Sequence, residues 1–302
     1  MHRAPFARRL VAGALALVPL LAAARSSTPS DTTPPAERRP ITLRFAAVVG
    51  AEPFACGRSY AGIGTAKSTI TPSEFRMFVH GVELLTADGK AVPLALEQDG
   101  RWQSEGLAML DFEDGSGPCG NGTPELRTTI TGTAPEGRYT GVRFVVGVPF
   151  ERNHGDLAQQ PAPLSVTRMF WAWNSGHKFI RLDAKTETGK NWVLHLGSAG
   201  CTPNEVATAS PTQCAHANRV TVTMDRFDID ADAIVADVAA LYAGSDLENN
   251  QPRTAAGCMA GPTDSDCGPV FAALGLPFGD APAGSQRFFT VKAGAARTAQ
   301  VP

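Results

Sequence analysis

The sequence has few charges and no surplus of positive charge. Only 19% of the 302 residues are charged, and the formal net charge is −2. Lys and Arg are scattered along the chain and form no basic stripe. Nucleic acids and anionic membrane surfaces are bound through clustered Lys and Arg. We therefore expect no nucleic-acid partner and no binding to an anionic membrane surface.

The sequence also lacks an apolar run long enough to span a membrane. Its longest run near the N-terminus, Leu10–Ala24, falls short of the about 20 residues that a spanning helix needs. Three arginines precede this run: Arg3, Arg8 and Arg9. A basic segment, an apolar segment and a run of small residues are typical of a signal peptide. We predict a signal peptide over residues 1–24, with cleavage after Ala24, and no membrane insertion.

No cysteine follows the apolar run, where a lipoprotein would carry its lipid anchor; Arg25 stands there instead. The leader contains three arginines and no acidic residue, so the mature chain has 24 basic and 29 acidic residues, a net charge of −5. The prediction is a periplasmic or secreted protein.

Motifs of common hydrolases are missing. There is no G-x-S-x-G segment, and Ser, His and Asp are too scattered to nominate a triad. Glu113 and Asp114 could be a pair of glycosidase acids, but a solvated turn explains them better. The series Asp228-x-Asp230-x-Asp232 lacks the Gly and Glu of an EF-hand, so Asp230 or Asp232 is read as a helix cap.

Six cysteines remain after the leader, and none has the C-x-x-C spacing of a zinc site. An even number of cysteines in an exported chain predicts disulfides. Six cysteines allow 15 pairings. Proximity favours Cys201 with Cys214 and Cys258 with Cys267, which leaves Cys56 for Cys119.

The chain offers many short alternating runs separated by Asp-Gly, Asn-Gly and Glu-Gly turns. We predict strands over residues 41–49, 74–85, 91–96, 107–112, 126–133, 140–148, 191–197, 219–227 and 286–291. Only one segment has helical spacing, Ile234–Tyr242, and it ends before Gly244. The predicted class is all-β: an antiparallel β-sandwich with long disulfide-stapled loops and one short helix.

Pro, Ser and Thr dominate residues 25–40, which we interpret as a flexible linker. The single β-sandwich domain is expected over residues 41–292, and residues 293–302 form a tail. Residues 245–279 are interpreted as a loop.

The segment Arg168–Asp183 holds two of the four tryptophans. Trp171 and Trp173 are two residues apart, so in a strand both indoles face one side. Asn174-Ser175-Gly176 is a turn signal, and a second alternating run follows it. We predict a β-hairpin carrying two stacked tryptophans. On the sequence pattern alone, an aromatic cluster that closes the core is a better explanation than a functional site.

Three histidines stand where a soft metal could be bound. His80 ends one predicted strand, His195 lies in another, and His154 lies in the loop before the tryptophan hairpin. Imidazole is the commonest ligand for copper and zinc, and separated strands can bring histidines to one end of a sandwich. Each histidine also fits a surface or hydrogen-bonded core position. His177 and His216 are weaker candidates.

Several blocks of this sequence resemble the MbnP-like family. They are PFACGRSYAGIGT (residues 53–65), EFRMFVHGVEL (74–84), LDFEDGSGPCGNGT (110–123), GVRFVVGVPFERNH (141–154), MFWAWNSGHKFIRLD (169–183), HLGSAGC (195–201), LYAGSDLENN (241–250) and GCMAGPTDSDC (257–267). Together they extend over nearly all of residues 41–279.

The resemblance implies an exported copper-binding protein with a β-sandwich fold. It implies one copper ion, as Cu(I), and a tryptophan that a di-haem cytochrome c peroxidase-like partner oxidises to kynurenine. The matching residues here are Trp171 or Trp173, with His80, His154 and His195 as ligands. The chain would be the substrate of that partner and not an enzyme. The family often has an aromatic residue at the position of His177, which makes His177 either a further ligand or a changed hairpin contact.

Two other functions remain open at this point. A metal-free β-sandwich that acts as an interaction module would need the tryptophans only as core. A hydrolase would need a single acid or nucleophile whose loss abolishes turnover.

Overall fold

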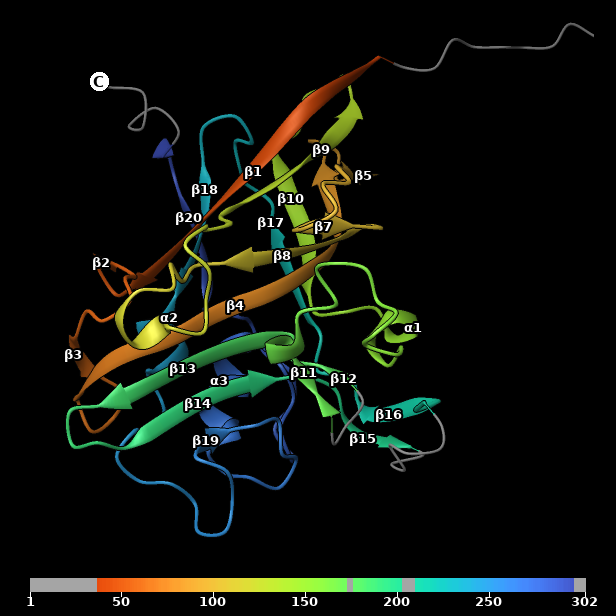
Figure 1. Cartoon of the computed structure of the whole chain (residues 1–302). Coiled ribbons are helices and arrows are strands. Elements are labelled where there is room, and N and C mark those ends of the chain that lie inside the picture. The colour runs from red at the N-terminus through yellow and green to blue at the C-terminus, as the bar shows by residue number, and fades with distance from the viewer. Residues whose placement is uncertain (1–36, 173–175, 203–209, 296–302) are drawn as a thin grey trace, which may run out of the picture. The chain divides into compact units, whose positions relative to one another are not determined.

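The computed structural model describes residues 37–172, 176–202 and 210–295, and most of its regular structure is strand (Figure 1). The first sheet has six strands in the order β20-β18-β1-β9-β6, with β2 beside β1. These strands are β1 Arg38–Val49, β2 Glu52–Pro53, β6 Ala95–Leu96, β9 Thr129–Pro135, β18 Ala233–Asp237 and β20 Phe289–Lys292.

The second sheet has ten strands, in the order β17-β10-β4-β13-β14-β19, with β3, β5 and β8 on β4 and β7 on β8. The six strands of the main path are β4 Ser68–Leu85, β10 Gly141–Val146, β13 Ile180–Thr186, β14 Asn191–Leu196, β17 Val220–Met224 and β19 Gly257–Cys258. The others are β3 Tyr60–Ile63, β5 Ala91–Pro93, β7 Gln103–Ser104 and β8 Leu107–Asp111. β1 with β18 and β14 with β19 are parallel pairs, and all the others are antiparallel.

The two sheets pack face to face around one apolar core. In β1, Ile41, Leu43 and Phe45 are buried while the residues between them are partly exposed, which is the alternation of a strand with one face inward. The ring of Phe144 on β10 lies 5.7 Å from that of Phe45 and 5.5 Å from that of Phe289 on β20. Each such buried side chain contributes about 1.5–3 kcal/mol to stability. The predicted all-β sandwich is confirmed.

Three short α-helices are present in the described residues: α1 Phe150–Asn153, α2 Val238–Tyr242 and α3 Cys267–Leu274. The predicted helix over 234–242 is therefore wrong in its first half, which is strand β18. A buried parallel strand is apolar on both faces, so its pattern does not differ from that of a short helix. Asp237 caps α2, accepting a hydrogen bond from the N–H of Ala239, and neither Asp230 nor Asp232 does so.

Other boundaries also differ from the prediction. Helix α3 lies in the segment that was expected to be a loop, and Gly275 ends it with φ 74°. β1 begins at Arg38, inside the predicted linker. The run 91–96 is two strands, because β5 pairs with β4 in one sheet and β6 with β9 in the other.

The three predicted disulfides are present: Cys56–Cys119, Cys201–Cys214 and Cys258–Cys267. The second one joins strands β15 Ala199–Thr202 and β16 Gln213–His216, which form a separate two-stranded sheet. None of the described helices is both long and apolar enough to cross a bilayer. The predicted signal peptide and most of the linker lie outside the described residues.

Candidate metal centre

The tryptophan hairpin is present as β11 Phe170–Trp171 paired with β12 Gly176–His177. The second strand of the hairpin ends at His177. The residues from Ile180 onward, which were expected to continue it, form β13 and pair with β4 and β14 in the large sheet. Trp171 is 4% exposed and belongs to the core. A Cβ atom at Gly197 would lie 2.4 Å from Cζ3 of Trp171, so the indole packs directly on this glycine. Trp173 lies outside the described residues, and its position beside Trp171 stays a prediction.

His195 on β14 lies next to Trp171, with ring centroids 6.4 Å apart. Its Nε2 is 2.7 Å from Oδ1 of Asp183. Burial lowers the pKa of His195 even though the Asp183 carboxylate favours its protonated form. An ionised Asp183 accepts a hydrogen bond from Nε2–H, so in the neutral imidazole the lone pair is on Nδ1. Nδ1 is buried and finds no hydrogen-bond partner among the described residues. A histidine that binds a metal through one nitrogen usually donates the other to a carboxylate.

A hollow of about 700 Å³ lies beside His195 and Asp183. Met259 lines it too. The parallel register of β14 and β19 pairs Val193 with Gly257 and Leu194 with Cys258, so Met259 follows next to His195. Imidazole and thioether are soft ligands that suit Cu(I) better than the hard cations Mg²⁺ or Ca²⁺.

A buried ionic network extends from Asp183 into the core. Arg181 bridges Asp183 (Nη2 to Oδ2, 2.7 Å) and Glu74 (Nη1 to Oε2, 2.9 Å). Arg76 then contacts Glu74 at 3.5 Å and Asp111 at 3.0 Å, and it pairs with Glu113. Burial raises the pKa of Glu74 to about 7 and that of Asp111 to about 6 against the pull of the arginines. Four carboxylates thus surround two arginines, and they fix the strand that carries Asp183.

His154 follows α1 and approaches the hairpin from another direction. A Cβ atom at Gly176 would lie 3.1 Å from Cε1 of His154, so the imidazole packs closely on this glycine of β12. Nε2 of His154 lies 3.3 Å from Sγ of Cys214 and 3.9 Å from Sγ of Cys201. These three side chains are the one cluster of three potential metal ligands that the described residues contain.

His177 is fully buried and fastens the hairpin to the loops before it. Its Nδ1 lies 2.9 Å from the carbonyl oxygen of Asn153, and its Nε2 lies 2.9 Å from that of Leu164. Burial lowers the pKa of His177, while the two carbonyls favour the protonated form. A carbonyl oxygen lies against each ring nitrogen, so His177 makes a hairpin contact and neither nitrogen is open to a metal.

His80 on β4 is far from His195. Arg181 on β13 pairs with both His195 and Arg76, and His80 comes four residues after Arg76. At ordinary strand spacing its Cα is about 13 Å along the sheet and about 10 Å across it from that of His195. Gly81, with φ 58°, forms a bulge opposite β10 at this point. The structure therefore brings His195 and His154 to the tryptophan hairpin but leaves His80 elsewhere.

Burial, with a smaller contribution from the charge of Arg219, lowers the pKa of His80 to about 4. The unfolded chain takes up this proton near pH 6.5, so the contribution of His80 to stability is complete above pH 6.5 and is lost as the pH falls toward 4. After allowance for solvent screening, we expect acidification from pH 7 to 4 to cost the wild type about 1–2 kcal/mol more than an H80Q variant. Urea unfolding at a series of pH values measures this difference.

The matched control is H216Q, since His216 is exposed. Its pH profile should follow that of the wild type. The raised pKa of Glu74 makes the folded chain more stable as the pH falls from 7 to 4.5, which is opposite to the effect of His80. This contribution is the same in all three proteins, so it cancels when their free energies of unfolding are compared. Parallel profiles for the wild type and H80Q would contradict the prediction.

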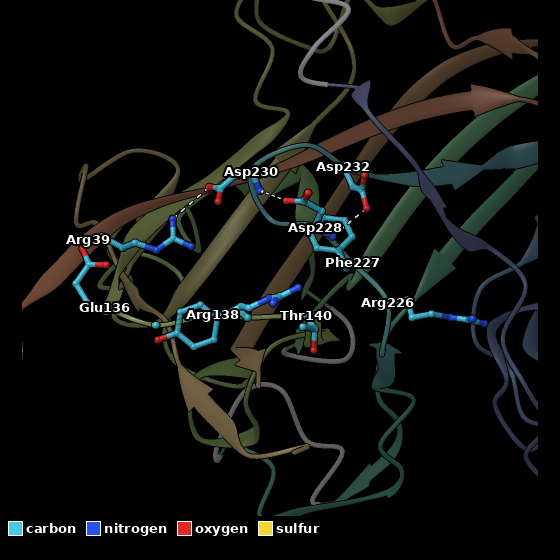
Figure 2. Close-up of a pocket in the computed structure, with 11 residues that line it drawn as sticks. Arg39, Glu136, Arg138, Thr140, Arg226, Phe227, Asp228, Asp230 and Asp232 are labelled. Carbon is cyan, nitrogen blue, oxygen red and sulfur yellow. Dashed lines mark hydrogen bonds and ion pairs between the residues drawn. The ribbon is translucent and has the colours of Figure 1, made fainter. Parts of the chain in front are cut away.

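The aspartates read as a weak calcium motif line a different hollow, of about 760 Å³ (Figure 2). Their oxygens serve the local backbone: Asp228 accepts from the N–H of Asp230, and Asp232 accepts from those of Asp228 and Gly294. Asp230 pairs with Arg39 at 3.2 Å. These contacts give the motif a role in the turn before β18. Glu113 and Asp114, the candidate glycosidase acids, do not share a site. Glu113 is buried and pairs with Arg76, whereas Asp114 is exposed.

Comparison with known proteins agrees with this architecture. The sequence model of MbnP matches residues 38–260. The chain belongs to the MbnP family. Among solved structures, it is similar to MbnP from Methylosinus trichosporium, with 33% sequence identity and a TM-score of 0.77. That match covers 86% of this chain and 100% of the other. A search of curated protein sequences found no match.

In this MbnP family member, sequence reasoning missed three residues around the hairpin: Asn153, Asp183 and Met259. Asp183 was recognised only as a strand position, because its contact with His195 depends on the β13–β14 register. Met259 lies in a segment that was expected to be a loop. Asn153 directly precedes His154, and this adjacency was the one signal that could have pointed to it.

Proposed function

We propose that this MbnP family member is an exported copper-binding protein. His195 and the tryptophan hairpin hold Cu(I), and a di-haem cytochrome c peroxidase-like partner converts Trp171 or Trp173 to kynurenine. The observation that carries the proposal is the His195–Asp183 pair beside Trp171, with a buried Nδ1 that lacks a partner among the described residues. Three disulfides support export, because they persist in oxidising compartments.

The residues present fit a copper ion better than a hard cation. The hollow is lined by two soft donors, the imidazole of His195 and the thioether of Met259, and its one carboxylate among the described residues, Asp183, is held by His195 and Arg181. Opening an indole to kynurenine would add an aniline nitrogen, a better ligand than the indole nitrogen. The role served by copper here is acquisition or homeostasis. His80, with its separate surroundings, is not part of the proposed ligand set.

The modification is tested on the tryptic peptide Met169–Lys178. We expect this peptide, from protein made in its native host or together with its genomic neighbour, to have lost one carbon and gained one oxygen. Fragmentation then assigns the change to Trp171 or Trp173. Protein made without the partner is the control and should give the unmodified mass. An unmodified peptide from a copper-starved native host would overturn the kynurenine assignment.

A further inference from the structure

The disulfide beside His154 is placed differently from the other two. Cys201 and Cys214 face each other across the β15–β16 sheet, and Nε2 of His154 approaches both sulfurs, at 3.9 and 3.3 Å. His154 and Cys201 are each 5% exposed and Cys214 is half-buried. In Figure 1, β15 and β16 lie beside β12, at the end of the molecule that carries α1. This group shares no residue with the His195 site.

The neighbouring contacts fix which nitrogen of His154 carries the lone pair. The backbone N–H of His177 donates to Oδ1 of Asn153 at 2.8 Å, so the NH₂ group of this amide faces His154. That NH₂ nitrogen lies 3.0 Å from Nε2 of His154. An amide NH₂ can only donate, so Nε2 accepts and is unprotonated. An unprotonated Nε2 close to two sulfurs is the form that binds a metal.

A disulfide sulfur is a poor metal ligand, whereas a thiolate is a strong, soft one. Reduction of Cys201–Cys214 by a dithiol breaks the S–S bond, takes up two electrons and two protons, and oxidises the dithiol to its disulfide. The two thiols then stay opposite each other, because β15 and β16 are also joined by other contacts. Thr212 N–H donates to the carbonyl of Thr202 at 2.8 Å, and the Gln213 amide donates to its hydroxyl at 3.2 Å.

We propose that reduction of Cys201–Cys214 creates a second Cu(I) site, formed by both thiolates and Nε2 of His154. Binding of one Cu(I) releases the two thiol protons and replaces the Asn153 hydrogen bond to Nε2. Two sulfurs and one imidazole form a donor set that suits Cu(I). The oxidised protein then holds copper only at the proposed hairpin site, and the reduced protein has capacity for one more ion.

The test uses the mature full-length protein with its disulfides intact or after reduction with dithiothreitol and its removal under nitrogen. Cu(I) is supplied with a competing chelator, and bound copper is counted per chain. We expect reduction to add one Cu(I) and X-ray absorption to show sulfur ligands. The double variant C201S/C214S should lose this gain, although its other two disulfides are reduced equally. H154A should bind the added ion at least about tenfold more weakly.

Three outcomes would overturn this inference. A gain that persists in C201S/C214S would belong to other thiols. Alkylation that marks Cys201 and Cys214 as free, with no gain in copper, would show that the thiols do not form a site. Loss of the near-UV circular dichroism signal on reduction, or resistance of this disulfide to dithiothreitol, would also end it. Copper held by the oxidised protein reports on the hairpin site alone, so failure of one proposal is distinct from failure of the other.

Discussion

An H195A variant is expected to lose the Cu(I) that the oxidised wild-type protein retains against a competing chelator. The second nitrogen of the His195 imidazole is already held by the carboxylate of Asp183, as is typical of a metal-binding histidine. Copper bound to the native state should also raise the melting temperature of the wild type, since a ligand that binds only the folded chain stabilises it. Removal of His195 should abolish that rise.

The variant D183N tests how the imidazole is positioned. An amide at this position can still contact Nε2 but no longer carries the charge that orients and polarises the ring, so we expect about 10–100-fold weaker copper binding. Binding should fall without loss of the near-UV circular dichroism signal, which separates this effect from unfolding. H216A is the matched control, because His216 is exposed, and it should bind like the wild type.

Wild-type affinity in H195A would refute the hairpin site. An equal melting temperature with and without Cu(I) in the wild type would instead favour the metal-free interaction module, in which Trp171 serves only as core.

The second large effect is expected for R76M. Arg76 is 3% exposed and contacts three carboxylates, those of Glu74, Asp111 and Glu113. Removing one partner from a buried ion pair leaves uncompensated charge in the core, and this typically costs about 3–5 kcal/mol. We expect a loss of this size in the free energy of unfolding, measured by urea titration with the disulfides intact.

The loss in R76M should shrink on acidification. Arg76 holds down the pKa of Glu74 and of Asp111, which burial still raises to about 7 and about 6, so without Arg76 the pKa of each acid is higher. Both acids are then more fully protonated in folded R76M than in the folded wild type, and protonation removes the uncompensated charge. R76M should therefore regain stability relative to the wild type between pH 7 and 5.

R143M is the matched control for R76M. Arg143 pairs with Glu83 at 2.7 Å, but its side chain is 41% exposed. Exposed pairs are worth about 0–1 kcal/mol. A loss in R76M no larger than in R143M would show that the network around Arg76 contributes little.

The sequence by itself determined the fold class and the disulfides. Alternating runs such as Ile41–Val49 can be recognised as strands from the sequence, because the two-residue period of a strand is a local feature. Two of the cysteine pairs are 13 and 9 residues apart, so proximity was enough to assign them, and the third followed by elimination. The tryptophan hairpin, too, could be recognised from its turn residues.

Only the tertiary structure decided which side chains meet. His195 reaches Asp183 through the β13–β14 register, and His80 is separated from His195 by the width of β13 and four residues of β4. A one-residue shift in register would turn these side chains to the opposite face, and no local pattern fixes it. The same holds for β18: it lies between β1 and β20, and packing buries both of its faces, so it lacks the alternating period that would have identified it as a strand.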